Sequence, residues 1–205
     1  MKEFEGLERG KYKAILIDPP WHFQAWAGGR FNGDDKPIYT PSRAPDYATM
    51  REQQLAGLPV ESLADKDCVM FLWICWPVLE QSLRLLPLWG FEYKSCGFCW
   101  VKGHAGQIEM FRDDIDPHMS LGYWTRSNSE VCLLATRGKP KRLDAGVKQA
   151  IIEPRREHSR KPDCVHDRIE RLVAGPYCEL FARQKRPGWD VWGNETNKFQ
   201  PVEAE

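Results

Sequence analysis

The chain has 205 residues, enough for one domain with a sizeable core, and 29 Lys plus Arg balance 29 Asp plus Glu. The resulting formal net charge of zero argues against a protein held on nucleic acid by its overall charge alone. No apolar run is long enough for a transmembrane helix, and the first twelve residues lack the apolar core of a signal peptide, so we expect a cytoplasmic protein without membrane contact.

The first predicted element is a buried strand over residues 12–17, YKAILI, because the run is short, apolar and partly β-branched. It leads directly into Asp18-Pro19-Pro20-Trp21. Residues 22–46 are polar and rich in Gly and Pro, which predicts a long loop. A loop of this length inside a compact domain usually has a function.

Further along the chain, predicted helices alternate with predicted strands. Apolar periodicity indicates a helix and its connection over 47–64, a strand over 67–75, an amphipathic helix over 77–91, strands over 93–102 and 130–138, a helix over 161–175 and a strand over 177–183. Residues 103–129 form a second long loop. The alternation predicts an α/β fold with a mainly parallel sheet, in which ligands bind outside the carboxyl ends of the strands.

Cysteine and tryptophan fit core positions in this pattern. The seven cysteines are scattered through apolar runs, and Cys96-x-x-Cys99 has no second pair at zinc spacing, so we expect no metal site. Trp73 and Trp76 fall in or beside the apolar strand over 67–75, where core packing is the expected role.

The Asp18-Pro19-Pro20-Trp21 turn suggests a specific chemistry. At the end of a parallel strand, the Asp18 carboxylate would point into the crevice, and the two prolines stiffen the turn and bring no N–H groups to compete for its carbonyls. A carboxylate and a fixed carbonyl together suit the two hydrogens of an exocyclic amine, and Trp21 would add a flat apolar wall. Two such acceptors can orient the amine lone pair toward an electrophile.

A plain turn is the alternative interpretation, since Asp and Pro both favour turns. The position between a buried strand and a long loop favours the functional interpretation.

The sequence resembles the MT-A-seventy (MT-A70) family of N6-adenine methyltransferases, in its bacterial or phage form. Beyond Asp18-Pro19-Pro20-Trp21, similar blocks recur in order between residues 11 and 196: YATM (47–50), FLWICW (71–76), GFCWVK (97–102), GYWTRSNSEVCLLATRGKP (122–140), REHSRKPDCVHDRIERLVAG (156–175), YCELFAR (177–183) and GWDVWGNE (188–195). The ordered set is far more specific than the tetrapeptide alone.

The resemblance implies one Rossmann-like methyltransferase domain over 1–205, with a core over about 11–196 and the catalytic motif ahead of the cofactor motif. It implies S-adenosylmethionine as cofactor. Asp18, Pro19, Pro20 and Trp21 would be catalytic, with Asp18 also near the cofactor; the substrate would contact Trp21, Tyr47, Arg126 and Asn128; the cofactor would contact Lys161, Glu179, Leu180, Phe181, Arg183, Asn194 and Glu195.

The implied activity is methyl transfer to the N6 amine of adenine. DNA is the preferred substrate because the short form resembles bacterial or phage members; RNA and a non-catalytic nucleic-acid-binding partner subunit are the alternatives. A base in a duplex must be flipped out to reach the pocket. We expect the loops over 22–46 and 103–129 to border the pocket, and a homodimer by the usual symmetry of oligomers.

Two further expectations concern charged residues between positions 137 and 166. We expect phosphate contacts from some of Arg137, Lys139, Lys141, Arg142, Arg155, Arg156 and Arg160. His158 and His166 flank Lys161, and a surface or helix-capping role is the simpler interpretation of both.

Overall fold

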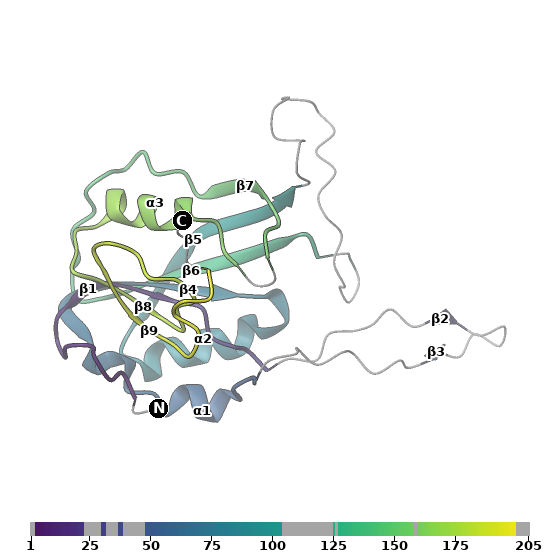
Figure 1. The fold of residues 1–205 in the computed structure, drawn as a ribbon, viewed down its shortest axis with the longest axis horizontal. Coiled ribbons are helices and arrows are strands. Elements are labelled where there is room, and N and C mark those ends of the chain that lie inside the picture. Colours follow the sequence, from purple (N-terminus) through teal and green to yellow (C-terminus); the bar gives the residue numbers. More distant parts are fainter. Residues whose placement is uncertain are drawn as a thin grey trace, which may run out of the picture.

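The computed structural model describes residues 3–22, 48–103, 125, 127–157 and 160–199, together with the backbone of 30–31 and 37–38. Its centre is a seven-stranded sheet in the order β7-β5-β6-β4-β1-β8-β9 (Figure 1). The strands are β1 (Tyr12–Ile17), β4 (Ala64–Ile74), β5 (Glu92–Gly103), β6 (Ser129–Arg137), β7 (Ala150–Pro154), β8 (Tyr177–Leu180) and β9 (Trp189–Trp192). A separate two-stranded ladder pairs β2 (Arg30–Phe31) with β3 (Pro37–Ile38), inside the predicted 22–46 loop.

Strand direction in the large sheet is nearly uniform. Strand β6 is antiparallel to both of its neighbours, β4 and β5, and the other four pairings are parallel. The predicted α/β class with a Rossmann-like sheet is therefore confirmed, while the permuted order of its motifs stays a prediction.

Helices cover both faces of the sheet. Helices α1 (Glu52–Ala56) and α2 (Leu79–Leu88) lie on one face and α3 (Cys164–Leu172) on the other, as Figure 1 shows. Two 3-10 turns, η1 (Val60–Ser62) and η2 (Trp76–Val78), precede β4 and α2. Among the described residues, no helix is long and apolar enough to cross a membrane.

The alternation of side chains along β1 builds two cores. Ile15 and Ile17 pack with Leu55 of α1 and Leu85 of α2. Ala14 and Leu16 point to the other face, in the core cluster that contains Val165 and Ile169 of α3. Because successive residues of a strand face opposite sides, one apolar run serves both layers.

Several predicted elements differ in extent from the observed ones. The helix expected over 47–64 is only the five-residue α1 followed by η1. Strand β7 was not predicted, because its apolar run is short and charged residues surround it. The strand lies at the outer edge of the sheet, where one of its two isoleucines, Ile152, is 44% exposed. Trp73 is buried as expected, whereas the core position predicted for Trp76 is wrong: its side chain is 48% exposed.

The carboxyl ends of the parallel strands lie along one side of the sheet, across the strands rather than at an outer strand. The parallel strands β1, β4, β5 and β8 finish there, and the antiparallel β6 begins there. We call it the carboxyl edge. Both long predicted loops leave from it, one after β1 and one between β5 and β6.

Candidate active site

Asp18 lies directly after β1, between the ends of β4 and β8. The pair Ile17 and Leu180 is the last in the β1–β8 ladder, and the Asp18 N–H donates to the Leu180 carbonyl at 3.4 Å. Its side chain is 21% exposed. Both carboxylate oxygens accept from the ammonium of Lys161, at 2.9 and 2.8 Å.

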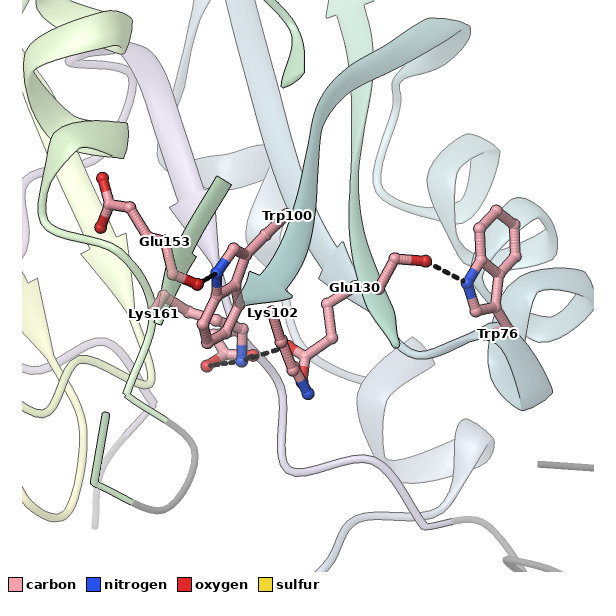
Figure 2. A network of polar contacts seen from close by, with 8 residues as sticks. Trp76, Trp100, Lys102, Glu130, Glu153 and Lys161 are labelled. Carbon is pink, nitrogen blue, oxygen red and sulfur yellow. Dashed lines mark hydrogen bonds and ion pairs between the residues drawn. The ribbon is translucent and has the colours of Figure 1, made fainter. Parts of the chain in front are cut away.

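A chain of alternating charges continues from this pair. Lys161 also approaches Glu130 at 3.3 Å, and the other oxygen of Glu130 accepts from Lys102 at 2.5 Å. Figure 2 shows Lys161, Glu130 and Lys102 converging from three segments of the chain. The Lys161 ammonium lies 5.6 Å from the ring centroid of Trp73. Each buried charge therefore has a partner of opposite sign, as burial requires.

Burial and pairing shift these groups in different directions. Burial raises the pKa of the Asp18 carboxyl above its ordinary value, although Lys161 opposes this shift. Burial also acts against the charged forms of Lys161 and Glu130. For Lys161 the two carboxylates outweigh it and the pKa is raised, and for Glu130 the two lysines outweigh it and the pKa is lowered.

The two prolines do not leave their carbonyls without protein donors. The Pro19 carbonyl accepts from the Trp21 N–H at 2.8 Å, and the Pro20 carbonyl accepts from the Met50 N–H at 2.8 Å. The expectation that this turn has no competing donors is therefore wrong. Since a carbonyl oxygen has two lone pairs, Pro19 keeps one further acceptor position.

Trp21 anchors the turn to the core. Its indole N–H donates to the Trp73 carbonyl at 2.9 Å, and its ring belongs to the core with 5% of the residue exposed. Trp21 is thus a core residue in this structure; contact between its small exposed edge and a base stays a prediction.

A pocket opens beside Asp18, between the end of β8 and the segment before α3. Cationic, acidic and aromatic side chains line it: Asp18, Arg160, Lys161, Asp163, His166, Glu179, Phe181, Arg183, Gln184, Arg186 and Phe199. Of the predicted cofactor residues, the structure brings five to this pocket: Asp18, Lys161, Glu179, Phe181 and Arg183.

Glu179 is held by a histidine. His166 Nε2 lies 2.8 Å from Glu179 Oε2, and the His166 ring packs edge-on against Trp189 at 4.8 Å. The surface or capping role expected for His166 is therefore wrong. His158 lies outside the described residues.

The turn after β8 has an unusual backbone. Phe181 adopts a positive φ of 61°, and its ring contacts Trp192 at 5.3 Å. Next to it, a Cβ on Gly193 would lie 2.5 Å from the Ala182 carbonyl, so only glycine fits. Such local strain is common at functional sites, and here it turns the chain toward the pocket.

The remaining predicted cofactor residues lie outside the pocket lining. The Leu180 side chain is fully buried in the core, so only its backbone faces the site. Asn194 and Glu195 are exposed, and Glu195 approaches Arg183 at 3.7 Å. Their contact with a cofactor stays a prediction.

Two predicted substrate residues, Tyr47 and Arg126, lie outside the described residues. Asn128 is described, and its carbonyl accepts from the Lys102 N–H at 3.0 Å at the carboxyl edge. It therefore lies two residues from Glu130, beside the charge chain.

Sequence reasoning missed Glu130, Gln184 and Phe199 as site residues. Glu130 lies at the start of the apolar strand β6, and the reversed direction of this strand brings it to the carboxyl edge. The Phe199 ring, which lies 5.1 Å from the Arg160 guanidinium, enters the pocket from the C-terminal segment, where no motif marks it.

The stretch of predicted phosphate contacts divides between the two edges of the sheet. Arg137 is the last residue of β6, which begins at the carboxyl edge, and the Lys139 N–H donates to Asp67, so both lie at the edge opposite the site. At the carboxyl edge, Arg156 and Arg160 both form ion pairs with Asp163.

All seven cysteines are free thiols, and burial raises the pKa of Cys75 to about 12. The described residues contain no group of His, Cys, Asp and Glu arranged to hold a metal ion.

The pocket fits S-adenosylmethionine by the chemistry of its donors. Lys161 and Arg183 suit the methionine carboxylate, Glu179 suits ribose hydroxyls, and the Phe181 ring suits an apolar or cationic face. Among the described residues, Arg160 Nε and His166 Nδ1 are buried without a hydrogen-bond partner, so two donor or acceptor positions remain for a ligand.

The family model for MT-A70 matches residues 12–195. The chain belongs to the MT-A70 family. This family comprises S-adenosylmethionine-dependent N6-adenine methyltransferases, so the methyl donor is S-adenosylmethionine.

Three relatives show how the MT-A70 chain compares in length. It is 33% identical to the type II methyltransferase M.MunI of Mycoplasma sp, over 98% of this chain and 86% of that protein. It is 31% identical to the mouse N(6)-adenine-specific methyltransferase METTL4, over 96% of this chain and 40% of that protein. It is 29% identical to the human N(6)-adenosine-methyltransferase catalytic subunit METTL3, over 91% of this chain and 28% of that protein.

Proposed function

We propose that this chain methylates the exocyclic N6 amine of adenine in DNA, with Asp18 as the group that holds the amine. The observation that carries the proposal is the position of the Asp18 carboxylate: it follows β1 at the carboxyl edge and lines the same pocket as Lys161, Glu179 and Arg183. Substrate amine and cofactor would thus meet at one carboxylate.

S-adenosylmethionine, when bound, supplies an electrophilic methyl group on a positively charged sulfur. Asp18 and the free lone pair of the Pro19 carbonyl accept the two amine hydrogens and aim the nitrogen lone pair. When the N–CH3 bond forms, the bond between the methyl group and sulfur would break, and the sulfur would leave as a neutral thioether. The methylated amine, which is far more acidic than an alkyl ammonium, would then lose one proton to solvent. Asp18 needs no strong basicity in this scheme.

Lys161 donates to both carboxylate oxygens of Asp18, and each oxygen keeps a further lone pair that can accept an amine hydrogen. Glu130 gives the Lys161 ammonium a second carboxylate at 3.3 Å. Lys161 therefore keeps a partner, and its charge stays compensated, while Asp18 receives the substrate.

DNA is favoured over RNA by sequence similarity. The chain is 33% identical to the bacterial type II methyltransferase M.MunI and 29% identical to human METTL3, an N(6)-adenosine-methyltransferase by name. The non-catalytic scaffold is disfavoured because Asp18, Lys161 and Glu179 are present together in one pocket. The loops over 22–46 and 103–129 as pocket borders, and the homodimer, stay predictions.

The test is transfer of labelled methyl groups from S-adenosylmethionine to single-stranded DNA, duplex DNA and RNA of mixed sequence. We expect N6-methyladenine in DNA, and a loss of turnover of at least about 10²-fold in Asp18→Ala and in Asp18→Asn, as for other groups that stabilise developing charge. Cofactor affinity should change little.

Asp65→Ala is the matched control, since this carboxylate lies near the start of β4 at the opposite edge. Near-normal turnover in Asp18→Ala would refute the assignment of Asp18. If only RNA became labelled, the substrate would be RNA and not DNA. If the protein neither bound the cofactor nor labelled any polymer, it would instead be a non-catalytic nucleic-acid-binding subunit.

A further inference from the structure

Trp76 is an exposed aromatic side chain at the carboxyl edge. It follows β4 by two residues and opens η2, where Pro77 stiffens the turn. Its side chain is 48% exposed, although Trp73, three residues earlier, is almost fully buried. An exposed tryptophan at the carboxyl ends of the strands, where the candidate active site lies, is available for contact with a substrate.

The orientation of the ring is fixed from within the site. The Trp76 indole N–H donates to the Ser129 hydroxyl at 3.2 Å, as Figure 2 shows. Ser129 immediately precedes Glu130, which pairs with Lys161, which pairs with Asp18. Because the polar edge of the indole is satisfied, the exposed part of the ring is left for an apolar or stacking contact.

Trp76 also stands close to Asp18 along the sheet. Strands β1 and β4 are neighbours, and Ile17 pairs with Leu72, so Asp18 is level with Trp73. Three further residues of extended chain place Trp76 on the order of 10 Å beyond that level. Stacked nucleotides repeat about every 3.4 Å along one strand, so this separation corresponds to about three nucleotides.

Among the described residues, Leu83 and Leu88 lie on α2, and Tyr93 lies near the start of β5, at the opposite edge. Ile152 lies near the carboxyl edge but on the outermost strand, β7, with β5, β6 and β4 between it and β1. None of these side chains bonds to Ser129, the neighbour of Glu130, as Trp76 does.

We propose that Trp76 stacks on a nucleobase that flanks the target adenine and so holds the substrate strand in place. The proposal rests on the proposed function and adds a binding residue to it. Aromatic stacking of this kind tolerates any base, so Trp76 contributes affinity and register rather than recognition of a sequence.

The first experiment measures methyl transfer and DNA binding by Trp76→Ala, Trp76→Phe and the control Leu88→Ala. We expect Trp76→Ala to raise the Kd and KM for oligonucleotides about 5- to 150-fold, with kcat at saturating DNA and cofactor affinity nearly unchanged. Trp76→Phe should restore most of the affinity, and Leu88→Ala should behave as wild type.

The second experiment scans an abasic nucleotide through the three positions on each side of the target adenine. At one position the abasic change should weaken binding of the wild type but not of Trp76→Ala, since the stacking partner is already missing. A double-mutant cycle of this kind isolates the contact from general loss of stability.

Each other outcome overturns the inference. Equal sensitivity of wild type and Trp76→Ala at all positions would exclude stacking even if the proposed function holds. Loss of a dimer in Trp76→Ala, without a position-specific abasic effect, would make Trp76 a subunit contact. Absence of methyl transfer to any nucleic acid by wild type would remove the proposed function and this inference together.

Discussion

Lys161 stands between two carboxylates, with Nζ 2.8 Å from Asp18 and 3.3 Å from Glu130. Its side chain is 18% exposed, so solvent screens these attractions only weakly. Removing one partner of a buried pair usually costs more than the pair contributes, because a charge is left uncompensated. Lys161 therefore holds Asp18 in position and opposes the rise that burial causes in the pKa of its carboxyl.

We expect Lys161→Met to shift the acid side of the pH profile. The pKa of Asp18 is already raised by burial, and Lys161 opposes that shift, so its loss raises this pKa further. A protonated Asp18 accepts fewer hydrogens from the amine, so activity should fall at a higher pH than in wild type and recover as pH increases. The pH dependence of kcat/KM measures the shift.

Lys161→Arg is the control, because it keeps the positive charge. Its acid limb should stay near that of wild type even if its turnover falls. Coincident acid limbs for wild type and Lys161→Met would show that Lys161 does not govern the ionisation of Asp18.

At the scale of elements, α2 has two clearly different faces. Leu85 and Leu86 are fully buried against the sheet, whereas Leu83 is 38% exposed. Arg84 joins this helix to α1 through Glu52, at 2.9 Å. The helix thus fixes the layer beneath β4, and with it the position of η2 and Trp76.

We expect Leu85→Ala to lower the free energy of unfolding by roughly 2–5 kcal/mol, since it leaves a cavity in the core. Leu83→Ala, two residues away on the same helix, should cost less than about 1 kcal/mol. Urea unfolding of the wild type and of both variants measures these losses, since a shift of the midpoint at an equal m-value reports a change in the free energy of unfolding. Equal losses would contradict the assignment of the buried face.

At the scale of the whole molecule, the sheet separates two groups of basic residues. Arg137 and Lys139 lie at the edge opposite Asp18, and β6, nine residues long, spans the distance between the edges. At about 3.3 Å per residue, that strand covers close to 30 Å. A strand of nucleic acid held at Asp18 therefore has no short path to this group.

We accordingly expect the double variant Arg137→Ala and Lys139→Ala to bind DNA with an unchanged salt dependence. Removal of a single lysine–phosphate pairing would reduce the slope of log K against log salt by about 0.7 to 0.9. Binding titrations across a range of salt concentrations measure this slope. A slope reduced by the amount expected for one or two phosphate contacts would mean that bound DNA extends to the basic residues at the opposite edge of the sheet.

Local sequence was enough to specify most of the strands of the large sheet, the α/β class and the position of Asp18, but not β7. A short apolar run such as β1 specifies a strand because both of its faces are buried, and a motif placed directly after such a run must lie at a strand end. Lys161, Glu179, Phe181 and Arg183 were likewise found from the family resemblance, since ordered local motifs carry these residues to the pocket.

Contacts between distant segments depend instead on the assembled fold. The reversed direction of β6 brings Glu130 to Lys161, the close packing under the turn buries Trp21, and η2 turns Trp76 outward although its neighbours are apolar. His166 meets Glu179 for the same reason. Local periodicity reports which residues are apolar, but strand direction and the layer above each residue decide which of them meet, and those are properties of the complete sheet.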